Sequence, residues 1–239
     1  MTYDAWRVTH GESPMNTIYL VRHGENPANV NKQFSHRKVD FPLNEKGVLQ
    51  ARQTAEHFRG IHLDEVYSSP LLRAVETAEI IAAEIGLPVK TMEAFREVDA
   101  GDLEGLPPTD ENWRTYMSVI RDWYDGRPET AFPGGENYFD AARRVLDGLR
   151  EVVQGKSGKS ILIAGHGGIF IVAVTALRAT SDLRMLQEVP LENCGISEMT
   201  AWVEDGRLKG ELVRWGAFDH LSGEAAELVS SQPGGDRTE

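Results

Sequence analysis

The sequence of 239 residues contains a single cysteine, Cys194, and no long apolar run. One cysteine excludes an intrachain disulfide and an all-cysteine metal site, and it fits a reducing compartment. No stretch of apolar residues is long enough to span a bilayer, and the first residues lack the basic and apolar segments of a secretory signal. We therefore expect a cytoplasmic protein that does not associate with a membrane.

Basic side chains are scarce. The chain has 25 Lys and Arg against 37 Asp and Glu, which gives a formal net charge of -12. This balance argues against a sequence-independent nucleic-acid binder, because such proteins gain affinity by neutralising phosphates with Lys and Arg. Long-range attraction of an anionic substrate is unfavourable as well. A phosphate site in this chain must depend on a few arginines concentrated in one pocket.

Hydrophobic residues make up 41% of the chain and charged residues 26%, which is the composition of a folded protein. Residues 1–15 show no clear periodicity, and residues 223–239 are polar and rich in small side chains. We expect these two segments to be tails. Between them, residues 16–222 show no internal boundary and are expected to form one domain.

Short apolar runs predict strands over 17–21, 65–68 and 160–164, each of which ends at polar residues. Strands that alternate with helices favour a mainly parallel sheet covered on both faces. The fold class expected is therefore α/β, a three-layer α/β/α sandwich with a mainly parallel central sheet. The further elements expected are helices over 44–58, 110–124, 137–153 and 168–177 and strands over 195–203 and 208–214.

A further helix is expected after the strand over 65–68. Ser68 or Ser69 can cap it, Pro70 can open it, and the apolar spacing that follows is helical. This placement puts Arg73 on the first turns of the helix.

Two predicted strands end in histidine. Arg22, His23 and Gly24 follow the first strand, and His166 lies in the GHGG turn after residues 160–164. Open α/β sheets bind ligands at the carboxyl ends of their strands. A lone histidine at such a place is commonly an ordinary hydrogen-bonding residue, but two with glycine-rich turns favour a catalytic pair.

The segments LVRHGENPAN, DFPLNEKGVLQA, VYSSPLLRAVETA, FREVDAGDLEG, PGGEN and IAGHGG occur in this order. From about Thr17 to Leu221 the chain thereby resembles the histidine phosphatase superfamily, the phosphoglycerate mutase-like proteins. The resemblance implies that His23 is phosphorylated and that Glu97 is the proton donor. The catalytic residues expected are His23, Glu97, Arg22, Arg73 and His166, and the substrate contacts expected are Arg22, Gly24, Asn29, Arg73, His166 and Gly167.

The chemistry of these residue types supports the same roles. A neutral imidazole nitrogen of His23 can attack phosphorus and divide hydrolysis into two transfers. Guanidinium groups such as those of Arg22 and Arg73 match the equatorial phosphate oxygens, and they disfavour protonation of a nearby histidine. The leaving oxygen needs a proton, for which Glu97 is the best placed carboxyl group in the matched segment.

For some of these positions an ordinary structural role remains an alternative to the functional one. Glu97 shares its segment with Asp99, Asp102 and Glu104, and surface carboxylates are common. Asn29 could cap a turn instead of contacting phosphate.

The sequence leaves open whether Ser35 and His36 touch substrate. The aromatic residues between Gly105 and Pro133 are expected to cover the pocket, with a core role favoured over substrate contact. PGGEN at 133–137 predicts a turn into a helix.

We expect a metal-independent phosphomonoesterase that acts on small phosphorylated metabolites and needs no cofactor. The alternatives are a phosphoglycerate mutase, disfavoured by the PGGEN segment, and a non-catalytic phosphate-binding module, disfavoured because His23, Arg22, Arg73 and His166 are all present. No close His and carboxylate cluster has the spacing of a metal site. The partner expected is a small-molecule phosphate ester, with neither nucleic acid nor membrane, and a homodimer is left open.

Overall fold

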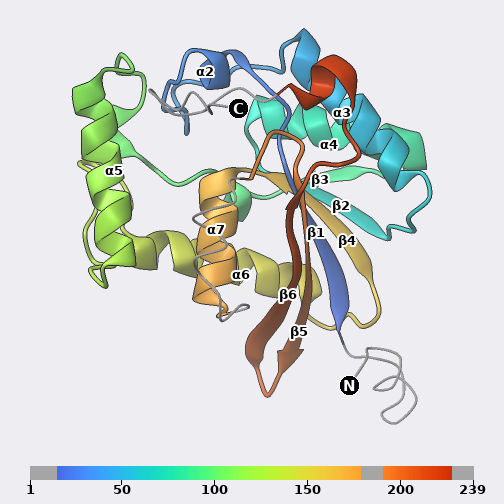
Figure 1. Cartoon of the computed structure of the whole chain (residues 1–239). Coiled ribbons are helices and arrows are strands. Elements are labelled where there is room, and N and C mark those ends of the chain that lie inside the picture. Colours follow the sequence, from blue (N-terminus) through green and yellow to red (C-terminus); the bar gives the residue numbers. More distant parts are fainter. Residues whose placement is uncertain (1–14, 179–190, 228–239) are drawn as a thin grey trace.

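The computed structural model describes residues 15–178 and 191–227, which form a six-stranded sheet with helices on both faces (Figure 1). The strand order is β3-β2-β4-β1-β5-β6. The first four strands of this order run parallel, whereas β5 pairs antiparallel with β1 and β6 antiparallel with β5. The strands are β1 (Asn16–Arg22), β2 (Glu65–Ser68), β3 (Val89–Thr91), β4 (Ser160–Gly165), β5 (Ile196–Glu204) and β6 (Arg207–Ala217).

The central strands are apolar because both of their faces are covered. Successive residues of β4 alternate between two cores: Ile161 and Ile163 face one, and Leu162 and Ala164 face the other. This alternation follows from the two-residue period of a strand. The expected α/β/α sandwich with a mainly parallel sheet is therefore confirmed.

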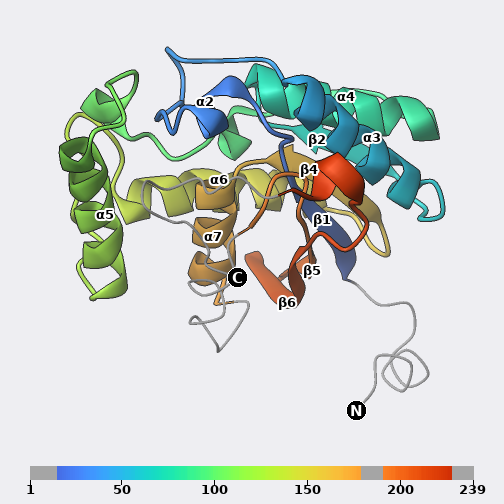
Figure 2. The ribbon, with the colours of Figure 1, turned by 45° about the horizontal axis from the view of Figure 1, so that its top comes forward.

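Two helix layers enclose the sheet (Figure 2). Helices α3 (Glu45–Phe58) and α4 (Leu72–Ile85) pack together on one face. Helices α6 (Tyr138–Val153) and α7 (Gly167–Ala176) cover the other face, and α5 (Asp110–Tyr124) stands beside them. Among the described residues, every helix is too short or too polar to cross a lipid bilayer.

Asparagine and threonine side chains mark where the longer helices begin. Asn44, Thr109 and Asn137 each accept a hydrogen bond from a backbone N–H of the helix that follows. These caps explain why α3 and α6 begin one residue after the asparagine at which the sequence pattern places their starts.

The predicted start of α4 is wrong. The helix begins at Leu72, with no side-chain cap from its N-cap residue. Ser69 accepts a hydrogen bond from the backbone N–H of Leu71 and also bonds with the ring of His166. The backbone N–H of Leu72 donates instead to the carboxylate of Asp40, with 3.0 Å to each oxygen. A residue from a distant loop thus satisfies the first turn.

Five short elements were not expected: β3, the one-turn helix α2 (Pro27–Val30) and three 3₁₀ turns, at Glu93–Phe95, Gly101–Leu103 and Gly223–Ala226. Ala225, in the segment expected to be a C-terminal tail, is buried, and its carbonyl accepts a hydrogen bond from Gln50 of α3. The predicted N-terminal tail, apart from residue 15, and residues 228–239 lie outside the described residues.

Candidate active site

His23 follows β1 directly, at the carboxyl edge of the parallel strands. Its backbone N–H donates to Gly165 at the end of β4, which brings the two histidine turns together. The ring is buried, and Nδ1 lies 2.8 Å from the carbonyl oxygen of Gly24. Because a carbonyl only accepts, Nδ1 carries the proton and Nε2 keeps its lone pair.

The electrostatic surroundings keep that ring neutral. Burial, followed by the positive charges of Arg73 and Arg22, holds the pKa of His23 well below its usual value of 6.5. Each of these effects disfavours the imidazolium form. His23 therefore presents an unprotonated Nε2 at neutral pH, as the sequence argument expects.

Arg73 projects from the first turn of α4 and is buried. Its Nε–H group donates to Nε2 of His23 at 3.1 Å. Its two terminal nitrogens donate to Oγ and to the carbonyl oxygen of Ser35, each at 2.9 Å. Burial lowers the pKa of Arg73 to about 10, a value at which it is still charged at neutral pH.

Arg22 is the last residue of β1 and lies next to the same site. Its Nη1 donates to the carbonyl oxygen of Leu191 at 2.6 Å. Burial lowers its pKa, while the nearby carboxylates of Glu192 and Glu97 raise it. A Cβ added at Gly167 would lie 3.9 Å from Cδ of Arg22, so the GHGG turn passes beside this arginine.

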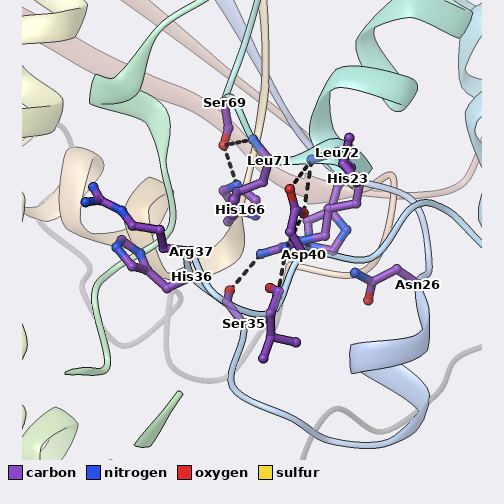
Figure 3. A network of polar contacts seen from close by, with 12 residues as sticks. His23, Asn26, Ser35, His36, Arg37, Asp40, Ser69, Leu71, Leu72 and His166 are labelled. Carbon is purple, nitrogen blue, oxygen red and sulfur yellow. Dashed lines mark hydrogen bonds and ion pairs between the residues drawn. The ribbon is translucent and has the colours of Figure 1, made fainter. Parts of the chain in front are cut away.

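His166 is fully buried and precedes α7 (Figure 3). Its ring centroid is 5.1 Å from that of His23, and its Nε2 lies 2.7 Å from Oγ of Ser69. Burial, followed by the charge of Arg73, holds the pKa of His166 well below 6.5. Its Nδ1 has no hydrogen-bond partner among the described residues. A buried polar atom of this kind is unusual and marks a position where a ligand can bind.

Glu97 reaches the start of α7. Its Oε1 accepts from the backbone N–H of Ile169 at 2.8 Å, and Oε2 accepts from Gly168 at 3.2 Å. A Cβ at Gly168 would come within 2.7 Å of Oε1, so glycine at this position lets the carboxylate approach without a shift. The positive end of the helix and these N–H groups fix its position.

The rival carboxylates of the same segment point elsewhere. Asp99 accepts from the backbone of Gly101, and Asp102 is exposed. Glu104 accepts from the backbone of the loop over residues 36–39. Of the four acidic residues, Glu97 is the one that bonds to the GHGG turn.

Gly24 and Asn29 both have contacts within the protein. The N–H of Gly24 donates to Oγ1 of Thr77, and a Cβ there would come within 2.5 Å of the carbonyl oxygen of Gly47. Close packing of the segment after β1 against α3 therefore requires glycine at this position. Asn29 forms a reciprocal cap with Asn26 at α2, and its Oδ1 also accepts from the amide of Asn193 at 3.2 Å. The substrate contacts expected of Gly24 and Asn29 stay predictions.

Sequence reasoning left Ser35 and His36 open, and the structure places both in the hydrogen-bond network of the site. Ser35 holds Arg73, and the Nδ1–H of His36 donates to the backbone oxygen of Glu97 at 2.7 Å. Asn193 was missed entirely. Its amide donates to the carbonyl oxygen of His23 at 2.9 Å, and no local pattern marks it as a site residue.

Trp113, Tyr116 and Trp123 of α5 pack against the core, as expected, whereas Tyr124 is exposed. Phe34 lies 4.7 Å from Trp113 and 4.9 Å from Tyr116 between ring centroids, and Tyr116 stacks on Phe132. Burial raises the pKa of Tyr116, with the charge of Glu97 as a further cause.

Within the described part of the chain, no group of three or more His, Cys, Asp or Glu side chains is arranged to hold a metal ion. Positive charge at the site comes from Arg22 and Arg73. The fold and the site together define an α/β protein with a buried pair of histidines and a pair of arginines at the carboxyl edge of a parallel sheet.

Comparison with known proteins identifies the family. Residues 18–215 match the histidine phosphatase superfamily (branch 1), and the chain belongs to this family. The uncharacterized phosphatase PhoE of Bacillus subtilis is 34% identical over 209 residues, which cover 87% of this chain and 98% of PhoE. The probable phosphoglycerate mutase GpmB of Salmonella choleraesuis is 31% identical over 204 residues, 80% of this chain and 90% of GpmB.

Solved structures show the same fold. Bacillus stearothermophilus YhfR superposes with a TM-score of 0.70 at 28% identity, covering 86% of this chain and 98% of YhfR. A mycobacterial glucosyl-3-phosphoglycerate phosphatase gives a TM-score of 0.71 at 23% identity, covering 85% of this chain and 99% of that protein. The family thus contains both phosphatases and phosphoglycerate mutase-like proteins.

Proposed function

We propose that this protein is a phosphomonoesterase that hydrolyses small phosphorylated metabolites through a phosphohistidine at His23. The observation that carries the proposal is the state of the His23 ring. Its proton is on Nδ1, its Nε2 keeps the lone pair and accepts a hydrogen bond from Arg73, and burial together with two arginines holds its pKa low. Membership of the histidine phosphatase superfamily supports the same chemistry.

In the first step, Nε2 of His23 attacks phosphorus and the bond from phosphorus to the ester oxygen breaks. The guanidinium groups of Arg22 and Arg73 balance the charge on the equatorial oxygens. His166 accepts a hydrogen bond from Ser69 on Nε2, so that its Nδ1–H can donate to a phosphate oxygen. Glu97 gives its proton to the leaving oxygen.

In the second step, Glu97 takes a proton from water as the water oxygen attacks phosphorus. The bond between phosphorus and Nε2 breaks, and inorganic phosphate leaves. Neither step draws on a metal or a cofactor, because Arg22 and Arg73 supply the positive charge. The location proposed is cytoplasmic, which the buried single thiol of Cys194 supports.

Phosphoglycerate mutase is the second candidate, and the resemblance to GpmB favours it. A mutase would return the phosphate from His23 to another oxygen of its substrate instead of to water. The two reactions share the first step, and they differ in the acceptor. A phosphoglycerate substrate therefore distinguishes them, because hydrolysis releases inorganic phosphate and isomerisation does not.

The test is a screen of purified protein against a panel of phosphomonoesters with a chelator present, followed by rapid mixing with the best substrate. An alkaline denaturing quench preserves the acid-labile bond between phosphorus and nitrogen, and mass spectrometry of peptides locates it. We expect phosphate on His23 and unchanged turnover in the chelator. Phosphate on a serine, or turnover that depends on added metal, would overturn the proposed mechanism.

A further inference from the structure

The loop over residues 36–39 is wrapped around one oxygen of Glu104. Oε1 accepts the backbone N–H of His36 at 2.8 Å, of Lys38 at 2.7 Å and of Val39 at 3.1 Å, and that of Arg37 as well. Burial raises the pKa of Glu104, but these N–H groups outweigh it and lower the pKa overall. Successive N–H groups that converge on one anion form a nest, and here the chain fills its own nest.

The ends of this loop hold Arg73. Ser35 accepts both terminal nitrogens of the guanidinium group, one on Oγ and one on its carbonyl oxygen. Oγ of Ser35 in turn donates to the carbonyl oxygen of Val39 at 2.5 Å, which closes the turn. Asp40 lies 3.7 Å from Nη1 of Arg73 and also bonds to the first turn of α4. Figure 3 shows Ser35 and Asp40 beside His23.

Arg73 needs such support because it is a buried charge beside a second arginine. Burial lowers the pKa of Arg73 most and Arg22 lowers it further, whereas the carboxylates of Glu97, Asp40 and Glu104 raise it. A long flexible side chain in that position keeps a single orientation only when its donors have fixed acceptors. The structure supplies those acceptors from a loop whose shape depends on Glu104.

We infer that Glu104 is a positioning residue for the phosphate-binding guanidinium group of Arg73. Glu104 fixes the loop, the loop fixes Ser35, and Ser35 holds the guanidinium plane beside Nε2 of His23. This inference rests on the proposed function, because that proposal assigns Arg73 to the phosphate. Nothing in the sequence distinguished Glu104 from the other acidic residues of its segment as a residue with this role.

The test compares Glu104→Ala and Glu104→Gln with the matched control Asp102→Asn, an exposed carboxylate two residues away in the same segment. Calorimetry measures the affinity for inorganic phosphate and for orthovanadate, and kcat/KM is measured alongside. We expect Glu104→Ala to lose about 10- to 100-fold in both quantities, as misplacement by about 1 Å can cause. Glu104→Gln, which keeps one acceptor oxygen, should lose less, and Asp102→Asn should match the wild type.

Repeating the Glu104→Ala comparison in an Arg73→Lys protein separates the positioning of Arg73 from a general loosening of the fold. Arg73→Lys keeps the charge but removes the planar fork that bonds to Ser35. In the Arg73→Lys protein, Glu104→Ala should have little further effect, because loss of Glu104 acts through the guanidinium group that is already absent. Equal losses in both backgrounds would overturn the inference, as would wild-type phosphate affinity in Glu104→Ala.

Should Glu104→Ala not fold, Glu104→Gln carries the same comparison. Failure of the proposed function has a different signature, since wild-type protein would then bind vanadate without hydrolysing any phosphomonoester. The phosphate affinities would still decide the role of Glu104 in that case.

Discussion

The Nε–H group of Arg73 donates a hydrogen bond to Nε2 of His23 across 3.1 Å. The same nitrogen of His23 is the one whose lone pair must attack phosphorus, because Nδ1 carries the proton. The arginine therefore donates to the attacking nitrogen itself. We expect a phosphate oxygen to take this donor when substrate binds, which would leave the Nε2 lone pair free to attack phosphorus.

His23→Ala should reduce turnover by about 10³-fold or more, because no other group at the site can replace the attacking nitrogen. The ring is buried at 4% exposure, so its removal should also lower stability slightly. Single-turnover kinetics and thermal unfolding measure the two effects. Covalent phosphate in the His23→Ala protein would contradict the assignment.

Glu97→Gln should slow alkyl phosphates by about 10²- to 10⁴-fold, the usual contribution of general acid catalysis, and aryl phosphates far less. Aryl oxygens are good leaving groups that scarcely need a proton. Steady-state rates on one substrate of each kind provide the comparison. Asp99→Asn is the matched control and should show no such selectivity, and a selective loss there would move the proton donor to Asp99.

Arg73→Gln should raise the pKa of His23. Burial and two positive charges now hold that pKa well below 6.5, and the variant removes the charge with the larger effect. Because protonation blocks Nε2, the acid limb of activity should lie below pH 6.5 in the wild type and move to higher pH in the variant. Nitrogen-15 NMR titration of the ring measures the shift without turnover, and Arg59→Gln, an exposed residue distant from the site in sequence, is the control. An unchanged titration would show that the charge of Arg73 does not reach the ring.

Arg144→Met should destabilise the fold and lower kcat. Arg144 on α6 pairs with Glu136 and donates to the backbone oxygens of Ala94, Arg96 and Glu97. Loss of these bonds leaves partly buried acceptors without this donor, at about 1–3 kcal/mol for an acceptor that stays unpaired. Urea denaturation measures the stability, and kcat on an alkyl phosphate reports the position of Glu97. Arg143→Met, on an exposed neighbouring residue, should leave both unchanged.

Gly24→Ala should destabilise the protein by about 1–3 kcal/mol, the usual result of forcing an extra methyl group into a packed site. Its Cβ would come within 2.5 Å of the carbonyl oxygen of Gly47. Gly60→Ala is the control, because a Cβ at Gly60 meets nothing within 4 Å. Thermal unfolding measures the difference. Equal melting temperatures for the two variants would show that the segment after β1 and α3 can move apart without loss of stability.

Local sequence pattern was sufficient for the elements and for the choice of most site residues. The apolar runs of β1, β2 and β4 and the helical spacing of α3, α5 and α6 depend on periods of two and 3.6 residues, which are visible in the chain itself. His23 and His166 stand directly after two of these strands. Neighbouring parallel strands then bring them to one edge of the sheet, so their meeting could be predicted.

The tertiary structure alone decided which partner each polar group takes. Asp40 satisfies the first turn of α4, Ser69 bonds to His166 rather than capping that helix, and Glu104 organises a loop more than sixty residues earlier in the chain. The close contact with α3 requires glycine at position 24, and Asn29 takes part in the cap of α2. For each of these residues, local sequence propensity is equally compatible with other partners. Only the packing of distant segments, which fixes the distance and direction between donor and acceptor, selects one of them.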